Sequence, residues 1–519
     1  MTATRILIVG GGTAGWLTAA YLAKALALSP GGAAQITLLE SPEIGIVGVG
    51  EGAFPTIRAT LKFLGIREEE FLRETAATFK QGIRFVDWLH APEGDTRHEY
   101  FHPFEAPLQS DLGSLAPYWL AQDPRTRGTF AEAVAIQSRV AAAGRGPKCV
   151  HDDPFDGPLA YAYHFDAVKL AALLARHAIA GGVERIADVV TRVDVAPDGR
   201  IAGVETRDHG LLAADLFIDC TGFRAELIGR ALGEPIKSVR AHLFTDRAIT
   251  AKVPYGRSRT TLPSFTGATA HEAGWIWDIG LAEARGVGCV YSSAHVDDSR
   301  AAEILHAYLG TEDGTVTTRT LAFEPGYRDR QWIGNCVAVG LAGGFLEPLE
   351  ATGIVMIESA VAMIAEMLPQ GGAIDAPARR FNALMRARYD NVVTFLKLHY
   401  GLSRRREPFW RDHADRTTWP DVLVEQVEQW RFRPPGRFDL TLDTETFAYF
   451  NYQYVLYGMN DDAVLPAGRN RLPNAELAER QFARIRSLGA RAMLELLPNR
   501  ELLEQLGDMP LRERNPRSV

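Results

Sequence analysis

Cysteine is scarce in this chain: four residues among 519 are cysteine, and no two of them lie close in the sequence. Their positions are Cys149, Cys220, Cys289 and Cys336. These cysteines show none of the short spacings that hold metal ions, and four isolated cysteines do not form the framework of a disulfide-rich fold. The sequence therefore predicts free, mostly buried thiols in a reducing compartment and no bound metal ion.

Long apolar runs and an excess of positive charge are also missing. No apolar stretch reaches the roughly 18 residues that a membrane-spanning helix requires. The first residues run directly into a strand pattern, without the features of a secretory signal. The formal net charge is −8, which disfavours a general nucleic-acid-binding protein because such proteins present basic surfaces. We therefore expect a cytoplasmic protein that binds neither membranes nor nucleic acids.

The chain opens with a strand, a glycine loop and a helix. Residues 5–9 form a largely apolar strand, residues 10–15 read Gly-Gly-Gly-Thr-Ala-Gly, a helical stretch runs from Trp16 to about residue 28, and a second strand ends at Glu40. In this order the glycines allow a tight turn, the approach of a pyrophosphate and close contact of helix and strand, and the acid bonds a ribose. The predicted nucleotide-binding residues are Gly10, Gly12, Thr13, Ala14, Gly15 and Glu40.

The glycine loop alone does not distinguish FAD from NAD. Only one such fingerprint occurs, which disfavours enzymes that hold FAD and NADPH in two domains of this kind. Two glycine-rich segments, residues 48–52 and 340–344, favour FAD because their backbone can approach a flavin or its ribityl chain. We add Gly50 and Leu341 from these segments to the predicted FAD-binding residues.

Later segments extend the nucleotide-binding pattern. Residues 189–195, 201–206 and 211–218 read as three short strands joined by turns. Residues 336–340 read as a further buried strand, and a helix is predicted over 352–368. A series of short strands leading into a buried strand is typical of flavoprotein folds that share the opening βαβ unit.

These patterns predict an α/β fold of the FAD-binding, flavoprotein-monooxygenase type with a mainly helical C-terminal region. At 519 residues the chain exceeds the size at which one core stops growing, so more than one lobe is expected. The first unit would span residues 1–375, and residues 376–519 would cover the substrate. Within the first unit, the dinucleotide fold would be discontinuous, over 1–60, 185–235 and 330–370.

Four further segments resemble the flavin-dependent tryptophan halogenase family, and the resemblance extends over nearly the whole chain. The first segment is residues 274–280, Gly-Trp-Ile-Trp-Asp-Ile-Gly. In that family a Trp-x-Trp-x-Ile segment lies beside the flavin and keeps the substrate away from it. The resemblance gives Trp275 and Trp277 this shielding role; the alternative is simple core packing. The family motif usually ends in proline where this chain has Gly280, so substrate identity does not transfer with the motif.

The second segment is residues 78–85, Thr-Phe-Lys-Gln-Gly-Ile-Arg-Phe. It resembles the family segment that carries an essential lysine, which implies a catalytic role for Lys80. An ammonium would hydrogen-bond hypohalous acid and make its halogen more electrophilic, whereas a free amine would form a haloamine. Both possibilities remain open, and the alternative to either is a solvated lysine, the commonest fate of this residue type.

The third segment is residues 344–354, which resembles the family segment with a catalytic glutamate and implies this role for Glu350. The carboxylate would steady the halogenating species or accept the proton lost from the ring. Thr352 and Gly353 match residues whose backbone N–H groups hold the halide, and they begin a predicted helix, where free amides favour small anions. The alternative is ordinary helix capping by Glu350 and Thr352.

The fourth resemblance concerns the substrate side. His102 and Phe104 match family residues that line the indole pocket. Tyr452 stands where the family carries a tryptophan that stacks on the substrate; a phenol keeps a π-face but covers less area. The alternative for these side chains is half-buried packing with satisfied polar tips.

The resemblance implies an FAD-dependent halogenase that makes hypohalous acid from reduced flavin, O₂ and chloride or bromide. It would halogenate an electron-rich, indole-type aromatic compound through Lys80 and Glu350. Reduced FAD would diffuse from a separate flavin reductase, because no second nucleotide domain is visible. Two alternatives stay open: a flavin-dependent aromatic hydroxylase and a flavin-binding protein without turnover. A homodimer is also possible, as in many family members, although no interface can be read from the sequence.

Overall fold

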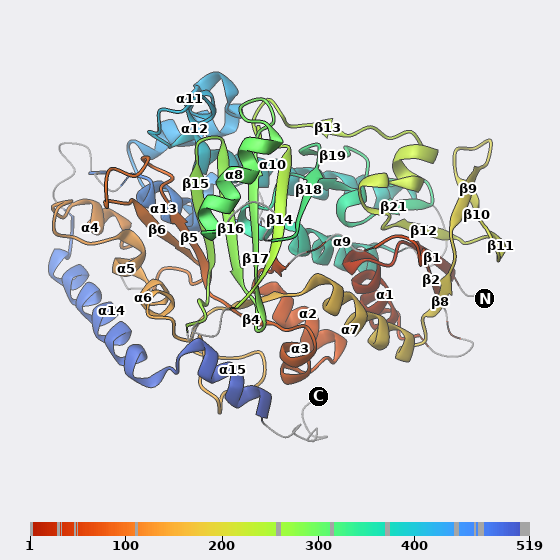
Figure 1. The fold of residues 1–519 in the computed structure, drawn as a ribbon, viewed down its shortest axis with the longest axis horizontal. Coiled ribbons are helices and arrows are strands. Elements are labelled where there is room, and N and C mark those ends of the chain that lie inside the picture. Colours follow the sequence, from red (N-terminus) through yellow and green to blue (C-terminus); the bar gives the residue numbers. More distant parts are fainter. Residues whose placement is uncertain are drawn as a thin grey trace.

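Two large sheets and the helices around them organise the chain (Figure 1). The computed structural model describes residues 4–28, 32, 34–45, 48, 50–108, 113–255, 261–311, 316–368, 374–440, 446–460, 463–464 and 472–508. Strands and helices alternate through the first part of the chain, and helices dominate its last part. The predicted α/β class with a helical C-terminal region is confirmed.

The first sheet has six strands and is mostly parallel. In spatial order its strands are β20 (Trp332–Ile333), β21 (Cys336–Ala338), β12 (Leu216–Asp219), β1 (Thr4–Val9), β2 (Ala34–Glu40) and β8 (Glu184–Ala187). Helix α1 (Thr13–Ala25) lies beside this sheet and packs against both α7 (Ala167–Ala180) and α9 (Gly353–Met367). Strands from widely separated parts of the sequence thus meet in one sheet, and the carboxyl ends of its parallel strands form the edge where such folds bind ligands.

The predicted strand over residues 211–218 is wrong as a single element. Residues Gly210–Leu212 form β11, which pairs antiparallel with β10 (Ile201–Thr206), and β10 pairs with β9 (Val190–Val195). The following strand, β12, instead joins the six-stranded sheet. Asp215 lies between them and accepts hydrogen bonds from Arg5, so the chain changes sheets within an apparently continuous apolar run.

The second sheet has seven strands and lies in the middle of Figure 1. Its order is β18 (Thr318–Ala322), β14 (Arg247–Pro254), β17 (Ala284–Tyr291), β16 (Gly274–Gly280), β15 (Thr266–His271), β5 (Gly82–Val86) and β6 (Glu99–Pro103). All neighbours pair antiparallel except β15 and β5, which are parallel. This sheet carries the Trp-x-Trp segment on β16 and His102 on β6.

A small three-stranded sheet joins two of the predicted site segments. Its central strand, β7 (Ala162–Phe165), pairs antiparallel with β3 (Glu51–Gly52) on one side and with β4 (Thr78–Lys80) on the other. The glycine-rich segment that ends at Gly52 therefore lies one strand away from Lys80. A second small sheet contains β13 (Lys237–Ser238), β19 (Gly326–Tyr327) and β22 (Gly344–Phe345).

The remaining helices surround these sheets. The earlier ones are α2 (Thr56–Leu64), α3 (Glu68–Glu74), α4 (Ala116–Leu120), α5 (Phe130–Val134), α6 (Gln137–Ala142) and α8 (Asp298–Leu309). Short turns of 3₁₀ or π type are η1 (Gly222–Arg224), η2 (Glu226–Ala231), η3 (Gly340–Ala342), η4 (Leu349–Ala351), η5 (Arg416–Thr418) and η6 (Arg437–Asp439). No helix of the described part combines the length and apolar composition needed to cross a bilayer.

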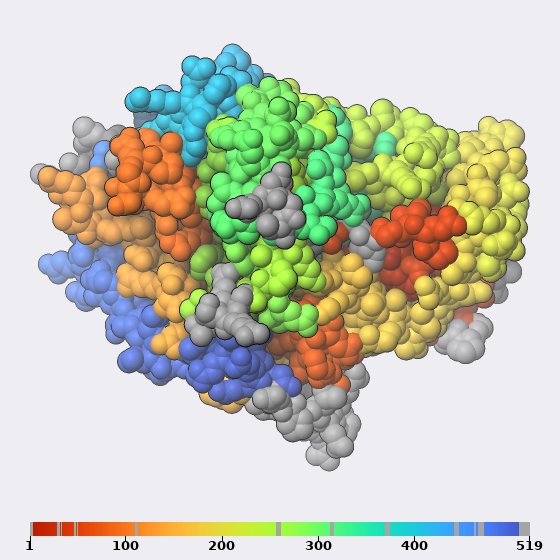
Figure 2. Space-filling model, in the orientation of Figure 1, coloured from red at the N-terminus to blue at the C-terminus, as the bar shows by residue number. Residues whose placement is uncertain are grey.

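The C-terminal helices are α10 (Asp375–Gly401), α11 (Pro408–Ala414), α12 (Asp421–Trp430), α13 (Tyr449–Gly458), α14 (Ala475–Glu495) and α15 (Asn499–Asp508). The long helix α10 contacts α9, α11, α12 and α13, so it ties the last part of the chain to the first. Helix α14 lies against α5 and α6, and its blue surface adjoins the orange surface of those helices in Figure 2. The four cysteines are free and three of them are buried, as predicted.

A buried carboxyl joins α2 to α9 and makes stability depend on pH. Glu358 accepts hydrogen bonds from the hydroxyls of Thr56 (2.6 Å) and Thr60 (2.5 Å), and burial raises its pKa to about 7. The folded state therefore holds a proton that the unfolded state, with a pKa of 4.5, releases. Stability contributed by this proton is full below pH 4.5 and is lost as the pH rises through about 7.

Glu358→Gln removes this ionisation while keeping a similar shape. We expect the free energy of unfolding to be nearly unchanged at pH 5 and higher than in the wild type at pH 8, by up to about 3 kcal/mol. Urea unfolding at the two pH values measures the difference. An equal effect of the substitution at both pH values would contradict the assignment.

Candidate active site

The glycine loop after β1 leaves no room for side chains at its two ends, but its middle has free space. Gly10 has φ +115°, and a Cβ there would lie 2.3 Å from the carbonyl oxygen of Cys220. A Cβ on Gly15 would lie 1.8 Å from the carbonyl oxygen of Gly10, whereas one on Gly12 would meet no atom within 4 Å. Helix α1 begins at Thr13 with no acidic side chain in its first turn. The loop thus offers space and helix-terminal amides to an anionic group.

Two other segments reach the same loop. Gly340 has φ +70°, and a Cβ there would lie 2.8 Å from the Cβ of Ala14, so η3 with Leu341 lies against the start of α1. Glu40 at the end of β2 accepts hydrogen bonds from Trp16 Nε1 (3.2 Å) and Arg185 Nε (2.6 Å). These contacts hold the carboxylate beside the loop. The residues therefore fit a dinucleotide cofactor, with Gly12 at the open position.

The Trp-x-Trp pair lies on the central strand of the seven-stranded sheet. Trp275 and Trp277 are both buried, with ring centroids 6.3 Å apart. Trp277 stands opposite Gly288 on β17, and a Cβ at residue 288 would lie 2.2 Å from the Trp277 ring. The indole ring therefore lies flat across the neighbouring strand where only glycine leaves room for it. Trp277 Nε1 has no hydrogen-bond partner among the residues described here.

Gly288→Ala is expected to displace the Trp277 ring, because the added methyl group would overlap it. We expect a loss of about 1–3 kcal/mol in the free energy of unfolding and a changed near-ultraviolet circular dichroism of the tryptophans. Gly267→Ala on β15 is a matched control, since its Cβ would make only an ordinary contact, 3.6 Å from Asp278 Cβ. Equal effects of the two substitutions would show that Trp277 does not depend on Gly288.

Lys80, at the end of β4, is completely buried, so the alternative of a solvated lysine is wrong. Its Nζ donates a hydrogen bond to the carbonyl oxygen of Ala53 (3.4 Å) and lies 5.2 Å from the ring centroid of Phe104. A Cβ on Gly52 would lie 3.1 Å from Lys80 Nζ and 3.5 Å from Ala351 Cβ, so the amine lies near the residue that follows Glu350. Burial lowers the pKa of Lys80 to about 8, against the opposing attraction of Glu350.

Glu350 is buried in a backbone conformation that non-glycine residues rarely adopt. Glu350 and Ala351 have φ +64° and +55°, a strained arrangement that is common at functional sites. Glu350 Oε1 lies 2.8 Å from His102 Nδ1 and 3.0 Å from His399 Nε2. Burial acts to raise the pKa of Glu350, but the two histidines outweigh it and lower the pKa to about 2. Glu350 also attracts the ammonium of Lys80, so the two predicted catalytic residues lie within electrostatic reach of each other.

Helix α9 begins directly after this glutamate. Thr352 is its N-terminal boundary residue and makes no side-chain capping hydrogen bond, and the Glu350 side chain is engaged with the histidines. Ordinary capping by these two side chains is therefore wrong. Gly353 is exposed, and a Cβ there would meet no atom within 4 Å. Gly353, the first residue of a 15-residue helix, therefore borders open space next to the buried Thr352. The amides of a helix start favour a small anion.

The predicted substrate-side residues divide into two groups. His102 contacts Glu350, and Phe104 lies beside Lys80. Tyr452 on α13 is instead buried against Phe395, with ring centroids 4.9 Å apart, and its hydroxyl accepts a hydrogen bond from Asn391 (3.1 Å). The α13 residues that approach His102 are Asn451, with Oδ1 2.9 Å from Nε2, and Tyr454, with a ring distance of 6.1 Å.

Sequence reasoning missed His399 and Asn451. His399 lies on α10 within a run of buried residues (Phe395, Leu396, Leu398 and Tyr400). The only local signal was one histidine on an apolar helix face, a pattern that packing alone explains. The approach of α10 and α13 to the β6 strand turns these two residues into partners of Glu350 and His102.

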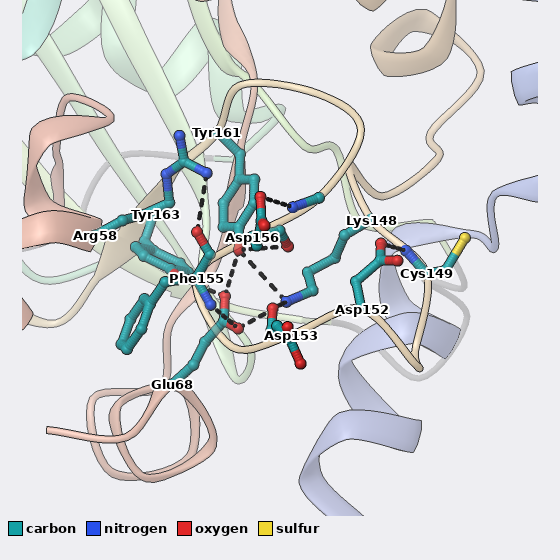
Figure 3. Close-up of polar contacts among 11 residues, drawn as sticks. Arg58, Glu68, Lys148, Cys149, Asp152, Asp153, Phe155, Asp156, Tyr161 and Tyr163 are labelled. Carbon is teal, nitrogen blue, oxygen red and sulfur yellow. Dashed lines mark hydrogen bonds and ion pairs between the residues drawn. The ribbon is translucent and has the colours of Figure 1, made fainter. Parts of the chain in front are cut away.

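A buried polar network supports the strand next to Lys80 (Figure 3). Glu68 on α3 accepts hydrogen bonds from Lys148 Nζ (2.8 Å), Tyr161 (2.8 Å) and Tyr163 (2.6 Å). Tyr163 lies on β7 opposite Phe79, the residue before Lys80. The network therefore fixes the strand against which β4 is aligned.

Fold and site together define a dinucleotide-binding fold with a buried lysine and a buried glutamate that interact electrostatically. A family model described as "Tryptophan halogenase" matches residues 5–472. Tryptophan 6-halogenase SttH of Streptomyces toxytricini is 34% identical over 95% of this chain and 96% of that protein. The structure of a tryptophan halogenase from Shewanella frigidimarina superposes with a TM-score of 0.93 at 38% identity, over 97% of this chain and 98% of that one. BrvH, a flavin-dependent halogenase from Brevundimonas, gives a TM-score of 0.85 at 31% identity, over 97% and 99%.

The chain therefore belongs to the flavin-dependent tryptophan halogenase family, and it is an enzyme of that class.

Proposed function

We propose that the enzyme halogenates an electron-rich, indole-type aromatic compound at Lys80 and Glu350. The observation that carries this proposal is the fully buried amine of Lys80 beside the buried carboxyl group of Glu350, with the pKa of the first lowered to about 8 and that of the second to about 2. Groups of this kind, shifted by burial and by specific partners, are characteristic of reaction sites.

FAD is the cofactor that fits the glycine loop. We assign its pyrophosphate to the segment from Gly10 to Gly15, including Thr13 and Ala14, and its ribose to Glu40; Gly50 and Leu341 would approach the flavin end. When bound in its reduced form, FAD activates O₂ and thereby oxidises a halide to hypohalous acid. Trp275 and Trp277 would keep the aromatic substrate away from the flavin. Residues 1–375 would form the FAD-binding unit and residues 376–519 the substrate cover.

The halide would be held by the backbone amides of Thr352 and Gly353. Their place at the start of α9, beside open space, supports this assignment. Chloride and bromide both suit a site made of amides, since neither needs a shaped coordination sphere.

The hypohalous acid would pass inside the protein, past Trp275 and Trp277, from the flavin site to a second site. There Lys80 would hold the electrophilic halogen and Glu350 would receive the proton. A ring carbon attacks the halogen and the carbon–halogen bond forms. The bond that breaks is the one from the halogen to oxygen, or to Lys80 Nζ where the free amine has already formed a haloamine and released water. The ring proton then leaves to Glu350, and water is the second product. His102 and Phe104 would border the arene at this point, and Tyr452 would support it from behind Phe395. Electron-rich π systems attack this electrophile readily at carbon, so we propose an aromatic rather than an aliphatic substrate.

Reduced FAD would come from a separate flavin reductase by diffusion. This arrangement, together with the four free cysteines, leads us to propose a cytoplasmic enzyme. We also propose that the enzyme forms a homodimer, which size-exclusion chromatography with light scattering would test.

The test incubates the protein with FAD, a flavin reductase, NADH, O₂, indole and either chloride or bromide. We expect the mass spectrum of the product to show replacement of one hydrogen by the added halogen. Addition of oxygen regardless of halide would identify an aromatic hydroxylase, and no product together with normal FAD binding would identify a flavin-binding protein without turnover.

A further inference from the structure

The contact between Glu350 and His399 fixes the position of a proton. All polar atoms concerned are buried. His399 Nδ1 lies 2.9 Å from the carbonyl oxygen of Phe395. A carbonyl oxygen only accepts hydrogen bonds, so Nδ1 must carry a hydrogen. A neutral imidazole has a single N–H, and His399 Nε2 would then present its lone pair to Glu350 Oε1 at 3.0 Å.

Two lone pairs at this distance repel each other, and burial weakens the screening of this repulsion by solvent. A separation of 3.0 Å is instead a hydrogen-bond distance and requires a proton between the two atoms. The proton makes His399 an imidazolium or Glu350 a carboxylic acid. In both forms the pair contains one proton more than a neutral imidazole with a carboxylate anion, and its net charge is zero.

His102 does not impose the same requirement. Its Nε2 faces the amide of Asn451, and an amide group can present either its oxygen or its N–H₂. With the N–H₂ turned toward Nε2, a neutral His102 carries its hydrogen on Nδ1 and donates it to Glu350 Oε1. The contact with Asn451 therefore leaves the proton count of His102 undetermined, whereas the carbonyl oxygen of Phe395 fixes that of His399.

We propose that Glu350 and His399 share one trapped proton between Oε1 and Nε2, and that His399 is thereby the positioning residue that sets the charge seen by Lys80. Both histidines contact Oε1 of Glu350, so Oε2 is the oxygen available to accept the ring proton. This inference deepens the proposed function and rests on it for the role of Lys80, but the position of the proton does not depend on turnover.

The net charge of the Glu350–His399 pair affects the protonation of Lys80. The other titratable groups facing this pair are Lys80, His102 and Tyr100, and His164 faces Lys80 from β7. Burial, with the charge of Glu350, raises the pKa of Tyr100, and burial, with the charge of Lys80, lowers that of His164, so both are neutral near pH 7. A neutral Glu350–His399 pair does not offset an ammonium fully, which favours the free amine of Lys80.

Nuclear magnetic resonance of the protein labelled with ¹⁵N-histidine tests the position of the proton. We expect two exchange-protected ring N–H signals from His399 at pH 7, both absent in His399→Gln and in His399→Asn. In Glu350→Gln only the Nδ1–H signal should remain. His271 is an internal reference, because its Nε2 donates to Val290 O and its Nδ1 accepts from Ala273 N, so it must show one N–H.

A single N–H signal from His399 in the wild type would overturn the proposal. A divalent metal ion held by His102, Glu350 and His399 would also overturn it; elemental analysis would reveal the ion and the Nε2–H signal would be missing.

The pH dependence of kcat/KM with indole tests the link to Lys80. His399→Gln leaves Glu350 a full anion. The apparent pKa that the pH profile of kcat/KM gives for Lys80 should therefore rise by about one unit. If His399 had only a structural role, the substitution would lower kcat without changing this apparent pKa. An unchanged apparent pKa would therefore overturn the proposed influence of His399 on Lys80. If the wild type halogenates no indole, the proposed function fails, whereas the N–H signals still decide the shared proton.

Discussion

Lys80→Met is expected to lower the yield of halogenated indole by about 10²–10³-fold while leaving FAD binding intact. The reason is that Lys80 supplies the buried amine that would hold the halogen next to the ring, and it lies on a strand apart from the glycine loop. Methionine keeps the length and packing of the side chain, and Lys80→Ala should have at least the same effect. Mass spectrometry of the product and a fluorescence titration of FAD measure the two quantities.

The chain offers a matched control in a second buried lysine. Lys397 on α10 is also fully buried, and it donates hydrogen bonds to His413 Nδ1 and Thr418 Oγ1, both at 2.9 Å. Lys397→Met should keep product formation per folded enzyme, because this lysine has partners of its own away from Glu350. Normal turnover in Lys80→Met would remove Lys80 from the mechanism, whatever the control shows.

Glu68→Ala is expected to destabilise the protein by about 3–5 kcal/mol, because it leaves a buried lysine without its counter-charge. Lys148 is 1% exposed and its Nζ lies 2.8 Å from Glu68 Oε2. The same substitution removes the acceptor of Tyr161 and Tyr163 (Figure 3). The midpoint of urea unfolding measures the loss.

A double variant separates the charge from the shape. In Glu68→Gln with Lys148→Met neither charge of the buried pair is left, so most of the lost stability should return relative to Glu68→Gln alone. Asp215→Asn, which disrupts the half-exposed pair with Arg5, should cost less than about 1 kcal/mol. Equal losses from the buried and the exposed pair would contradict the role given to the network.

The nucleotide half of the molecule could be predicted well from the sequence. The glycine loop, the strand ending at Glu40 and the helix near residue 353 are local patterns, because spacing and hydrophobic period set them within a few residues. The error over residues 211–218 has the same origin, since an apolar run does not reveal at which residue a strand leaves one sheet for another.

The second half of the site depends on contacts between distant residues. Lys80 and Glu350 could be predicted as site residues only through the resemblance, because no local sequence pattern indicates that a lysine is buried. His399 and Asn451 reach Glu350 and His102 only through the arrangement of α10 and α13 around β6. The ion pair of Glu68 and Lys148 likewise joins residues 80 positions apart, which no periodicity connects.

The central claim is that the oxidant passes inside the protein from the flavin site to Lys80. Turnover of indole with bromide in the presence of excess methionine tests it directly, because this thioether consumes free hypobromous acid and becomes the sulfoxide. We predict an unchanged yield of bromoindole and no methionine sulfoxide. Loss of bromoindole matched by formation of the sulfoxide would show that the oxidant escapes into solution, and it would contradict the account.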